Sequence, residues 1–336
     1  MNPLELEQQA DRLLLTLRKK PGVYFKITAL EKTLKLDKPG IVETLTEIKK
    51  WGYKIRTRPD AVAFIKAPDS LTPTEIGYRL KTGIIGRRIV SYRSVKSTND
   101  LAAELARNGA VEGTVVTAEE QTRGRGRLGR SWHSPPGTGV YLSIILKPKF
   151  KPEKAPGLSV MTAVALADAV RKFCDGDIRI KWPNDVLING KKTAGILTEL
   201  TAEKDKIDYV IIGVGINVNH GAGNFPDELK NIATSLRRVN RRKVNRVELL
   251  KTFLVNFENE YKSYGRHQLK KAHSRIRKYS SLIGHEIKIK LGRRLIEGKA
   301  VDIDPTGQLL MELDGQIVPV IAGEVTVVKE QTMSDL

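Results

Sequence analysis

An Asn-Gly pair at Asn189 and Gly190 separates two apolar runs, and no other local feature restricts the fold of this chain as strongly. Asn-Gly is a preferred two-residue β-turn because both residues tolerate positive φ, so residues 186–188 and 193–197 are predicted to form a hairpin. Further strands are predicted at residues 114–118, 140–146, 178–182 and 209–216, and a buried helix at residues 158–173. Residues 83–278 are therefore predicted to form an α+β domain around a mixed sheet.

Residues 1–66 have the pattern of three helices followed by a β-hairpin. Leucines at helical spacing precede a break at Pro21, and a second helix is expected over residues 27–34. Asp37 is a predicted N-cap of a third helix, with Pro39 in its first turn. Two strands then flank Pro59 and Asp60. This order of elements is typical of a winged helix-turn-helix.

Two further boundaries are predicted. Residues 67–73 contain two prolines, so residues 67–82 are interpreted as a linker. Residues 286–291 alternate with period two, and glycines punctuate the chain that follows. Residues 279–330 are therefore predicted to form a small β-barrel of SH3-like size.

The chain is strongly basic, with 58 Lys and Arg against 38 Asp and Glu and a net charge of +20. Residues 237–299 alone hold 19 basic and 5 acidic side chains. Such an excess attracts acidic proteins or nucleic acids, or is simply solvated, and the sequence leaves these alternatives open. A general RNA-binding protein would expose aromatic side chains among its basic ones, and only 6% of the residues are aromatic.

The single cysteine, Cys174, cannot form an internal disulfide, which suits a reducing compartment. No secretory signal and no apolar run long enough to span a bilayer are evident. We therefore predict a cytoplasmic protein that has no membrane partner.

Residues 124–132 contain three glycines and three arginines, and the segment ends at Trp132. Such a loop can fold main-chain N–H groups and guanidinium groups around a phosphate or carboxylate, although its composition also suits an RNA-binding or solvated loop. Likewise, residues 181–185, Lys-Trp-Pro-Asn-Asp, could be a purely structural turn. The chain has neither a P-loop nor a complete dinucleotide fingerprint, so a nucleotide must be bound in another way.

The motifs become specific through their combination and order. They are Ser97-Thr98-Asn99, Gln121 with residues 124–132, residues 181–185, residues 192–197 and residues 213–217. In this order they resemble the catalytic domain of biotin protein ligases, a mixed α/β domain of the biotin/lipoate ligase type that is similar to class II synthetases. The resemblance covers nearly the whole chain, since the segments in front and behind resemble those of the bifunctional ligase and biotin-operon repressor.

The resemblance implies an activity: biotin is joined to the α-phosphate of ATP, with Mg²⁺, and the biotinyl group then passes to a lysine of a biotin carboxyl carrier protein. Lipoate ligase is an alternative, and so is a DNA-binding regulator with a ligand-sensing ligase domain. The resemblance also implies roles for matching residues. Catalytic candidates are Lys192, Arg127 and Arg125. Biotin-binding candidates are Ser97, Thr98, Asn99, Gln121, Gly124, Arg125, Arg127, Lys192 and Gly195. ATP-binding candidates are Arg130, Trp132, Asn217, Asp185 and Lys181.

Each role has a structural alternative. Ser97 and Thr98 could cap a helix, Trp132 could be a core aromatic, and Lys181 and Asp185 could form a structural ion pair. No protein ligand for the magnesium ion is assigned.

The winged helix implies operator DNA as a partner, bound by a homodimer that forms when the adenylate is present. Candidate DNA contacts are Lys38, Lys49, Lys50, Arg56 and Arg58. Against this, Glu43 and Glu47 are predicted on the outward side of the third helix, where phosphates would repel them.

Overall fold

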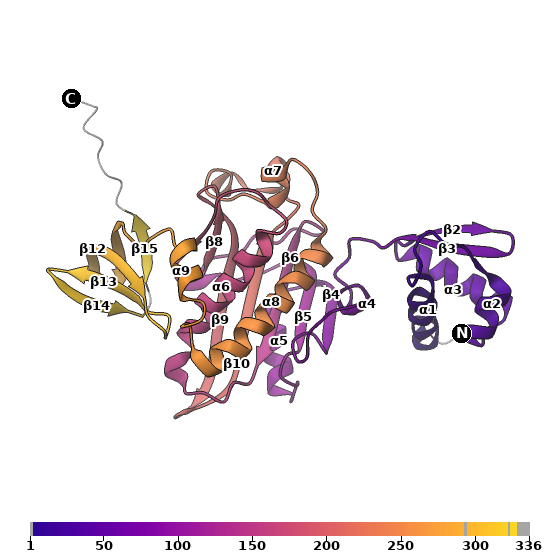
Figure 1. Cartoon of the computed structure of the whole chain (residues 1–336), viewed down its shortest axis with the longest axis horizontal. Coiled ribbons are helices and arrows are strands. Elements are labelled where there is room, and N and C mark those ends of the chain that lie inside the picture. Colours follow the sequence, from indigo (N-terminus) through magenta and orange to yellow (C-terminus); the bar gives the residue numbers. More distant parts are fainter. Residues whose placement is uncertain (1–2, 292–293, 322, 328–336) are drawn as a thin grey trace. The chain divides into compact units, whose positions relative to one another are not determined.

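The computed structural model describes residues 3–291, 294–321 and 323–327 (Figure 1). The chain divides into two compact units, Met1–Ser70 and Leu71–Leu336, and each unit has a hydrophobic core of its own.

The smaller unit packs three helices against a three-stranded antiparallel sheet of order β1-β3-β2. Its elements are α1 (Pro3–Leu17), β1 (Phe25–Lys26), α2 (Ile27–Leu34), α3 (Lys38–Lys50), β2 (Lys54–Arg58) and β3 (Ala61–Lys66). Asp37 caps α3 by accepting a hydrogen bond from the Gly40 N–H at 2.9 Å, as predicted. The two-residue strand β1, which pairs with β3, was not predicted.

The larger unit is built on a seven-stranded sheet of order β4-β5-β6-β10-β9-β8-β7. Its strands are β4 (Ile89–Val95), β5 (Val115–Gln121), β6 (Gly139–Leu146), β7 (Ile178–Lys181), β8 (Asp185–Ile188), β9 (Lys191–Glu203) and β10 (Lys206–Asn217). Only the β4–β5 pair is parallel within this sheet. The predicted mixed α/β sheet is confirmed.

The Asn-Gly hairpin forms where it was predicted. Asn189 and Gly190 have φ values of 51° and 75° and connect β8 to β9. Two positive φ angles in succession are the requirement of a type I′ turn. The hairpin sets Asp185 opposite Gly195, and Gly195 in turn pairs with Gly215 of β10.

Helices cover both faces of this sheet. On one face, α5 (Thr98–Arg107) packs through Ala102 and Ala106 against Val116 and Ile145. On the other lie α6 (Pro156–Val170), which is buried along most of its length, and α8 (Arg246–His267), which crosses in front of the sheet in Figure 1. The predicted helix at residues 158–173 corresponds to α6.

A second, five-stranded antiparallel sheet follows α9 (His273–Tyr279), in the order β14-β13-β12-β11-β15. Its strands are β11 (Glu286–Leu291), β12 (Arg294–Ile303), β13 (Leu309–Leu313), β14 (Gln316–Val320) and β15 (Glu324–Val327). Its buried side chains share one core with the larger sheet. The indole N–H of Trp182 donates to the Gly307 carbonyl at 2.9 Å. Residues 328–330 of the predicted barrel lie outside the described residues.

The predicted linker at residues 67–82 is too long. Leu71 and Ile76 are buried in the core of the larger unit. The helix α4 (Pro73–Gly77) has Thr72 as its N-cap, and the Thr72 hydroxyl accepts from the Glu75 N–H. Pro73 marks the start of this short helix rather than an extended chain, since proline is well tolerated in a first helical turn. The boundary between the two units in the sequence lies between Ser70 and Leu71.

Among the described residues, no helix has the length and apolar character that crossing a membrane requires.

Candidate active site

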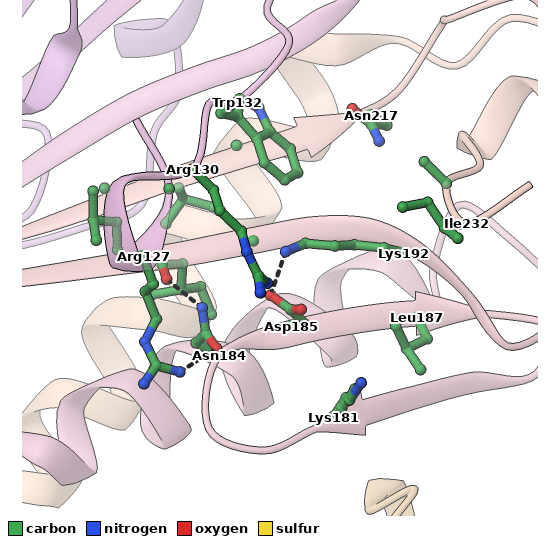
Figure 2. A pocket seen from close by; sticks show the side chains of 18 of the residues that line it. Arg127, Arg130, Trp132, Lys181, Asn184, Asp185, Leu187, Lys192, Asn217 and Ile232 are labelled. Atoms are coloured by element: carbon green, nitrogen blue, oxygen red, sulfur yellow. Dashed lines mark hydrogen bonds and ion pairs between the residues drawn. The ribbon is translucent and has the colours of Figure 1, made fainter. Parts of the chain in front are cut away.

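A cavity of about 780 Å³ opens at the end of the large sheet where β10 finishes (Figure 2). It is lined by strands β7 to β10, the start of α5, the loop at residues 124–132 and the chain at residues 225–233. All the predicted ligand-binding residues except Gly124 line this cavity. Five of the described lining side chains are cationic: Arg125, Arg127, Arg130, Lys181 and Lys192. Asp185 is the one carboxylate among the described lining residues.

Lys192 is held in place through its main chain and its side chain. Its N–H donates to the Ile232 carbonyl, and its carbonyl accepts from the Thr234 N–H, both at 2.9 Å. Its ammonium lies 2.8 Å from Asp185 Oδ1 across the β8–β9 pair. Asp185 is therefore an ion-pair partner of Lys192. The side chain of Lys192 is still 37% exposed, so its charge faces the cavity rather than the core.

Arg127 joins the glycine-rich loop to the turn between β7 and β8. Its guanidinium donates to Asn184 Oδ1 at 2.9 Å, and the amide of Asn184 donates to the Ile196 carbonyl at 2.9 Å. Figure 2 shows Arg127 and Arg130 on the glycine-rich loop and Lys192 on β9, and all three line the cavity. Cations from separate parts of the sequence thus converge on one volume, an arrangement that suits an anionic ligand.

Arg125 differs from these cations. Its guanidinium forms ion pairs of 2.7 Å with Asp100 and 2.8 Å with Glu199, neither of which lines the cavity. Two carboxylates already neutralise this charge. The predicted catalytic role of the Arg125 side chain therefore has less support than a role of its main chain.

Trp132 lies on a floor made of glycines. A Cβ atom at Gly215 would collide with the indole, and one at Gly195 would lie 3.0 Å from it. Glycine at these paired positions lets an aromatic ring approach the sheet directly. The indole N–H is buried on the side of Gly215 and has no hydrogen-bond partner among the described residues. Trp132 is therefore a cavity residue and not a core aromatic.

A connected polar network closes the cavity near α5. Gln121 Oε1 accepts from the N–H and hydroxyl of Thr98 at 2.9 and 3.1 Å, and its amide donates to Ser134 at 3.0 Å. Ser97 occupies the N-cap position of α5, yet its side chain makes no capping hydrogen bond. The capping alternative for Ser97 is therefore wrong, and Ser97 is one of the residues that line the cavity.

Both the oxygen and the nitrogen of the Asn99 side-chain amide form hydrogen bonds within the protein. The oxygen is 2.6 Å from the Ser143 hydroxyl, and the nitrogen donates to Glu199 at 2.6 Å. Gly213 is required beneath it, since a Cβ there would collide with the amide. These contacts give Asn99 a positioning role beside the cavity. Gly124 lies outside the lining residues, and a Cβ at Gly124 would collide with the main chain of Trp132.

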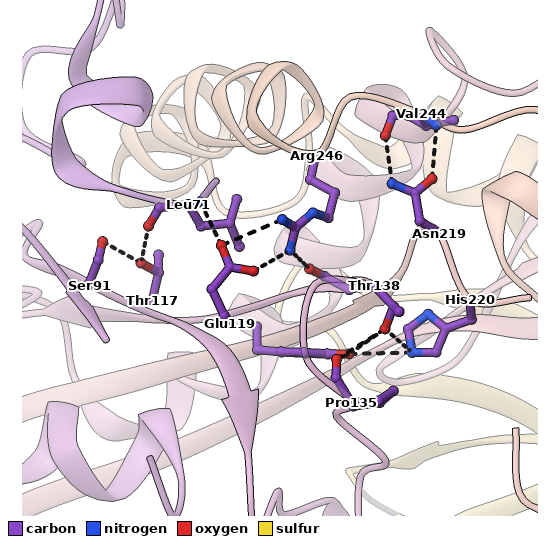
Figure 3. A network of polar contacts seen from close by, with 12 residues as sticks. Leu71, Ser91, Thr117, Glu119, Pro135, Thr138, Asn219, His220, Val244 and Arg246 are labelled. Carbon is purple, nitrogen blue, oxygen red and sulfur yellow. Dashed lines mark hydrogen bonds and ion pairs between the residues drawn. The ribbon is translucent and has the colours of Figure 1, made fainter. Parts of the chain in front are cut away.

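Asn217 ends β10 at the cavity, and a polar cluster follows it (Figure 3). His220 is fully buried and lies within hydrogen-bond distance of the hydroxyls of Thr138 and Tyr141. Burial, with a smaller contribution from His133, lowers the pKa of His220 to about 3. The imidazole is therefore neutral near pH 7 and adds no charge beside the cavity.

Sequence reasoning missed the chain segment at residues 225–233. Phe225 and Ile232 line the cavity, and Ala233 forms a parallel bridge with Lys192. No motif or period marks this segment, because it is attached to the site by main-chain hydrogen bonds that any residue can make. Asn184 lay within a recognised motif, but only the fold reveals its contact with Arg127.

No group of three or more His, Cys, Asp or Glu side chains is placed to hold a metal ion in the part of the chain that the structure describes.

The cavity is lined by cations, with glycines on one side and neutral polar side chains on another, and the chain has no P-loop. These features suit an enzyme that binds a carboxylate and a phosphate side by side. Comparison with known proteins specifies the class. Residues 91–217 match the model of the Biotin/lipoate A/B protein ligase family, and residues 282–328 match the Biotin protein ligase C terminal domain.

Curated relatives match over most of the chain. A bifunctional ligase/repressor BirA of Bacillus subtilis is 40% identical over 84% of this chain and 87% of its own length. The protein of the same name from Escherichia coli is 30% identical over 91% of this chain and 93% of its own. The biotin protein ligase of Aquifex aeolicus, solved with biotin and ATP, superposes with a TM-score of 0.62 at 30% identity, covering 72% of this chain and 99% of that one. This chain belongs to the biotin protein ligase family.

Proposed function

We propose that this protein is an ATP-dependent biotin protein ligase that transfers biotin to a lysine of a biotin carboxyl carrier protein. The observation that carries the proposal is the convergence of Lys192, Arg127 and Arg130 on one cavity, opposite a neutral polar wall. Biotin needs both surfaces, because it joins an uncharged ureido ring to a carboxylate.

The reaction takes place in two steps. A biotin carboxylate oxygen attacks the α-phosphorus of ATP, a P–O bond to the β-phosphate breaks, and pyrophosphate leaves. The acceptor amine then attacks the acyl carbon of biotinyl-5′-AMP, the bond to the phosphate breaks, AMP leaves and the nitrogen loses a proton. No enzyme nucleophile is needed.

Fixed cations stabilise the negative charge that develops in the first step. Lys192 is our candidate for contacting the carboxylate and the α-phosphate, and Asp185 holds its ammonium in position. Arg127 and Arg130 close over the phosphates. Asn184 keeps Arg127 attached to the sheet side of the cavity. Charge placed in advance in this way requires little reorganisation during the reaction.

Ser97, Thr98, Gln121 and the Arg125 main chain are proposed partners of the ureido ring, with Gly195 allowing the ring to approach β9. Trp132, Asn217 and Lys181 are proposed contacts of the nucleotide. Magnesium ions neutralise phosphate charge. Because the cavity offers Asp185 alone among described carboxylates, and this carboxylate pairs with Lys192, we propose that the ATP phosphates supply most of the ion's ligands.

The proposal predicts biotin-dependent release of pyrophosphate in the presence of ATP and Mg²⁺, and covalent labelling of a biotin carboxyl carrier domain. Mass spectrometry of the carrier after incubation should show one added biotinyl group. Lipoate in place of biotin should give little product, since it lacks the ureido group for which the polar wall is suited. Faster labelling with lipoate than with biotin would contradict the proposal in favour of a lipoate ligase.

For the N-terminal unit we propose a winged helix that binds operator DNA as part of a homodimer. The order of α1 to α3 and the β2–β3 hairpin supports this, and two relatives are named as repressors. Lys38, Lys49, Arg56 and Arg58 are exposed. Lys50 forms a 3.0 Å ion pair with Glu47, and the Arg58 guanidinium lies 3.8 Å from the centroid of the Tyr24 ring. We therefore rank Arg56 first among the candidate contacts.

Arg56→Ala is expected to weaken binding to the DNA upstream of the protein's own gene and to lower the slope of log K against log salt by about one unit. Fluorescence anisotropy over a salt series, with biotin and ATP present, measures both. Lys32→Ala, an exposed lysine on α2, is the matched control and should leave the slope unchanged. Equal slopes for both variants and the parent protein would remove Arg56 from the interface.

The SH3-like closure of the C-terminal sheet and the cytoplasmic location stay predictions.

A further inference from the structure

Five cations lie close together on α7 (Leu236–Asn240) and the loop after it, and none of them lines the cavity. They are Arg237, Arg238, Arg241, Arg242 and Lys243, all exposed, and we refer to them as the α7 cluster. From residue 230 to residue 247 the sequence contains no acidic residue. Like charges at this density repel one another, so the cluster does not help the chain to fold.

Both ends of the α7 cluster are attached to the chain that leaves β10. Before it, the Ser235 hydroxyl donates to the His220 carbonyl at 2.7 Å. After it, the Asn219 side chain accepts from the Val244 N–H at 2.9 Å and donates to the Val244 carbonyl at 2.8 Å (Figure 3). Asn219 and His220 follow Asn217, which lines the cavity. The cluster is thus fixed beside the cavity end of β10.

The cluster also adjoins the cavity directly. The guanidinium of Arg238 lies 5.7 Å from the centroid of the Phe225 ring, which is part of the cavity lining. The chain that leads into α7 is hydrogen-bonded to Lys192 at Ile232, whose carbonyl accepts from the Lys192 N–H. Ile232 is 62% exposed and also lines the cavity. A macromolecule that presents a side chain to Lys192 therefore comes close to the α7 cluster.

We propose that the α7 cluster is an electrostatic docking surface for the acceptor protein, which presents an acidic face around its target lysine. The proposal rests on the proposed function, because only the second step has a protein as substrate. Opposite charges raise the rate of encounter and orient the partners, and they leave the chemistry in the cavity unchanged. Nucleic acid would also be attracted, but a cluster at the mouth of a cavity that must admit a protein lysine is better placed for a protein.

The test compares Arg242→Glu/Lys243→Glu with Lys149→Glu/Lys151→Glu in the full-length chain. The second pair is also exposed, and it lies beyond the opposite end of β6 from the cavity. Both variants make the same change in net charge. Biotin transfer to a biotin carboxyl carrier domain is measured from 25 mM to 500 mM salt. Pyrophosphate release with hydroxylamine as acceptor, at saturating ATP and biotin, reports the first step without a protein partner.

We expect the α7 variant to lose about 10-fold in kcat/KM for the carrier at low salt, with the difference disappearing at high salt, where charges are screened. Its hydroxylamine reaction and both reactions of the control variant should match the parent protein. Arg242→Gln/Lys243→Gln should lose less, in proportion to the smaller change in charge.

Two results would overturn the proposal. One is carrier transfer that is unchanged or equally reduced in both charge-reversed variants. The other is a loss of DNA affinity in the α7 variant with transfer at the parent rate, which would assign the cluster to nucleic acid. A parent protein that releases no pyrophosphate with biotin would instead contradict the proposed function, and this result is seen before any variant is compared.

Discussion

Lys192→Ala should release pyrophosphate from ATP at least about 10²-fold more slowly than the parent protein, because removing one fixed cation from a phosphoryl-transfer site commonly costs this much in rate. Lys192 is the cavity lysine that pairs with Asp185, at 2.8 Å, so its ammonium is held at a defined position in the cavity. Rapid-quench measurement of biotinyl-5′-AMP formation isolates this step.

Lys191→Ala is the matched control, since the neighbouring lysine on β9 does not line the cavity. It should keep the parent rate. Lys192→Arg should recover part of the activity if charge is what matters, although a guanidinium differs in shape. Adenylate formation by Lys192→Ala at the parent rate would show that the reacting groups lie elsewhere in the cavity.

Glu119→Gln should lower the free energy of unfolding by about 3–5 kcal/mol, the usual cost of breaking a buried ion pair by removing the charge of one member. The side chain of Arg246 is 3% exposed and lies 2.6 Å from Glu119 Oε2, and it also donates to the Gly139 carbonyl (Figure 3). Glutamine keeps an acceptor for the Leu71 N–H but removes the carboxylate charge that lies against the Arg246 guanidinium. Urea unfolding followed by tryptophan fluorescence measures the change.

Glu297→Gln provides the comparison, because its ion pair with Lys288 is largely exposed on both sides and should contribute less than about 1 kcal/mol. Glu119→Met/Arg246→Met should regain part of the lost stability, since it removes both charges together. Equal destabilisation by Glu119→Gln and Glu297→Gln would mean that water reaches Arg246 in solution.

Local patterns predicted the elements whose causes are local. The Asn189-Gly190 turn formed as expected because its two positive φ angles depend on those residues alone. The Asp37 cap of α3 is likewise set within four residues. The linker was misjudged because proline has the same signature in a first helical turn and in an extended segment, and only the burial of Leu71 and Ile76 distinguishes them.

The motifs marked residues that line one cavity, but they did not predict the contacts between these residues. Motifs separated by tens of residues did meet in one cavity. Pairing partners could not be read from the sequence: Arg125 is neutralised by Asp100 and Glu199, and Lys192 is held by main-chain bonds to Ile232 and Thr234. Such contacts depend on how strands are ordered in the sheet, which no local pattern encodes.

The hydrogen bond from Trp182 to Gly307 bears on how this architecture can be rearranged. Within residues 181–185, Trp182 contacts the C-terminal sheet, while Asn184 and Asp185 bind two of the cavity's five cations, Arg127 and Lys192. The C-terminal sheet therefore supports the turn that lines the cavity, and we expect its removal to disturb that turn. The N-terminal unit, with a separate core, can be gained, lost or replaced in evolution or by engineering without disturbing that turn.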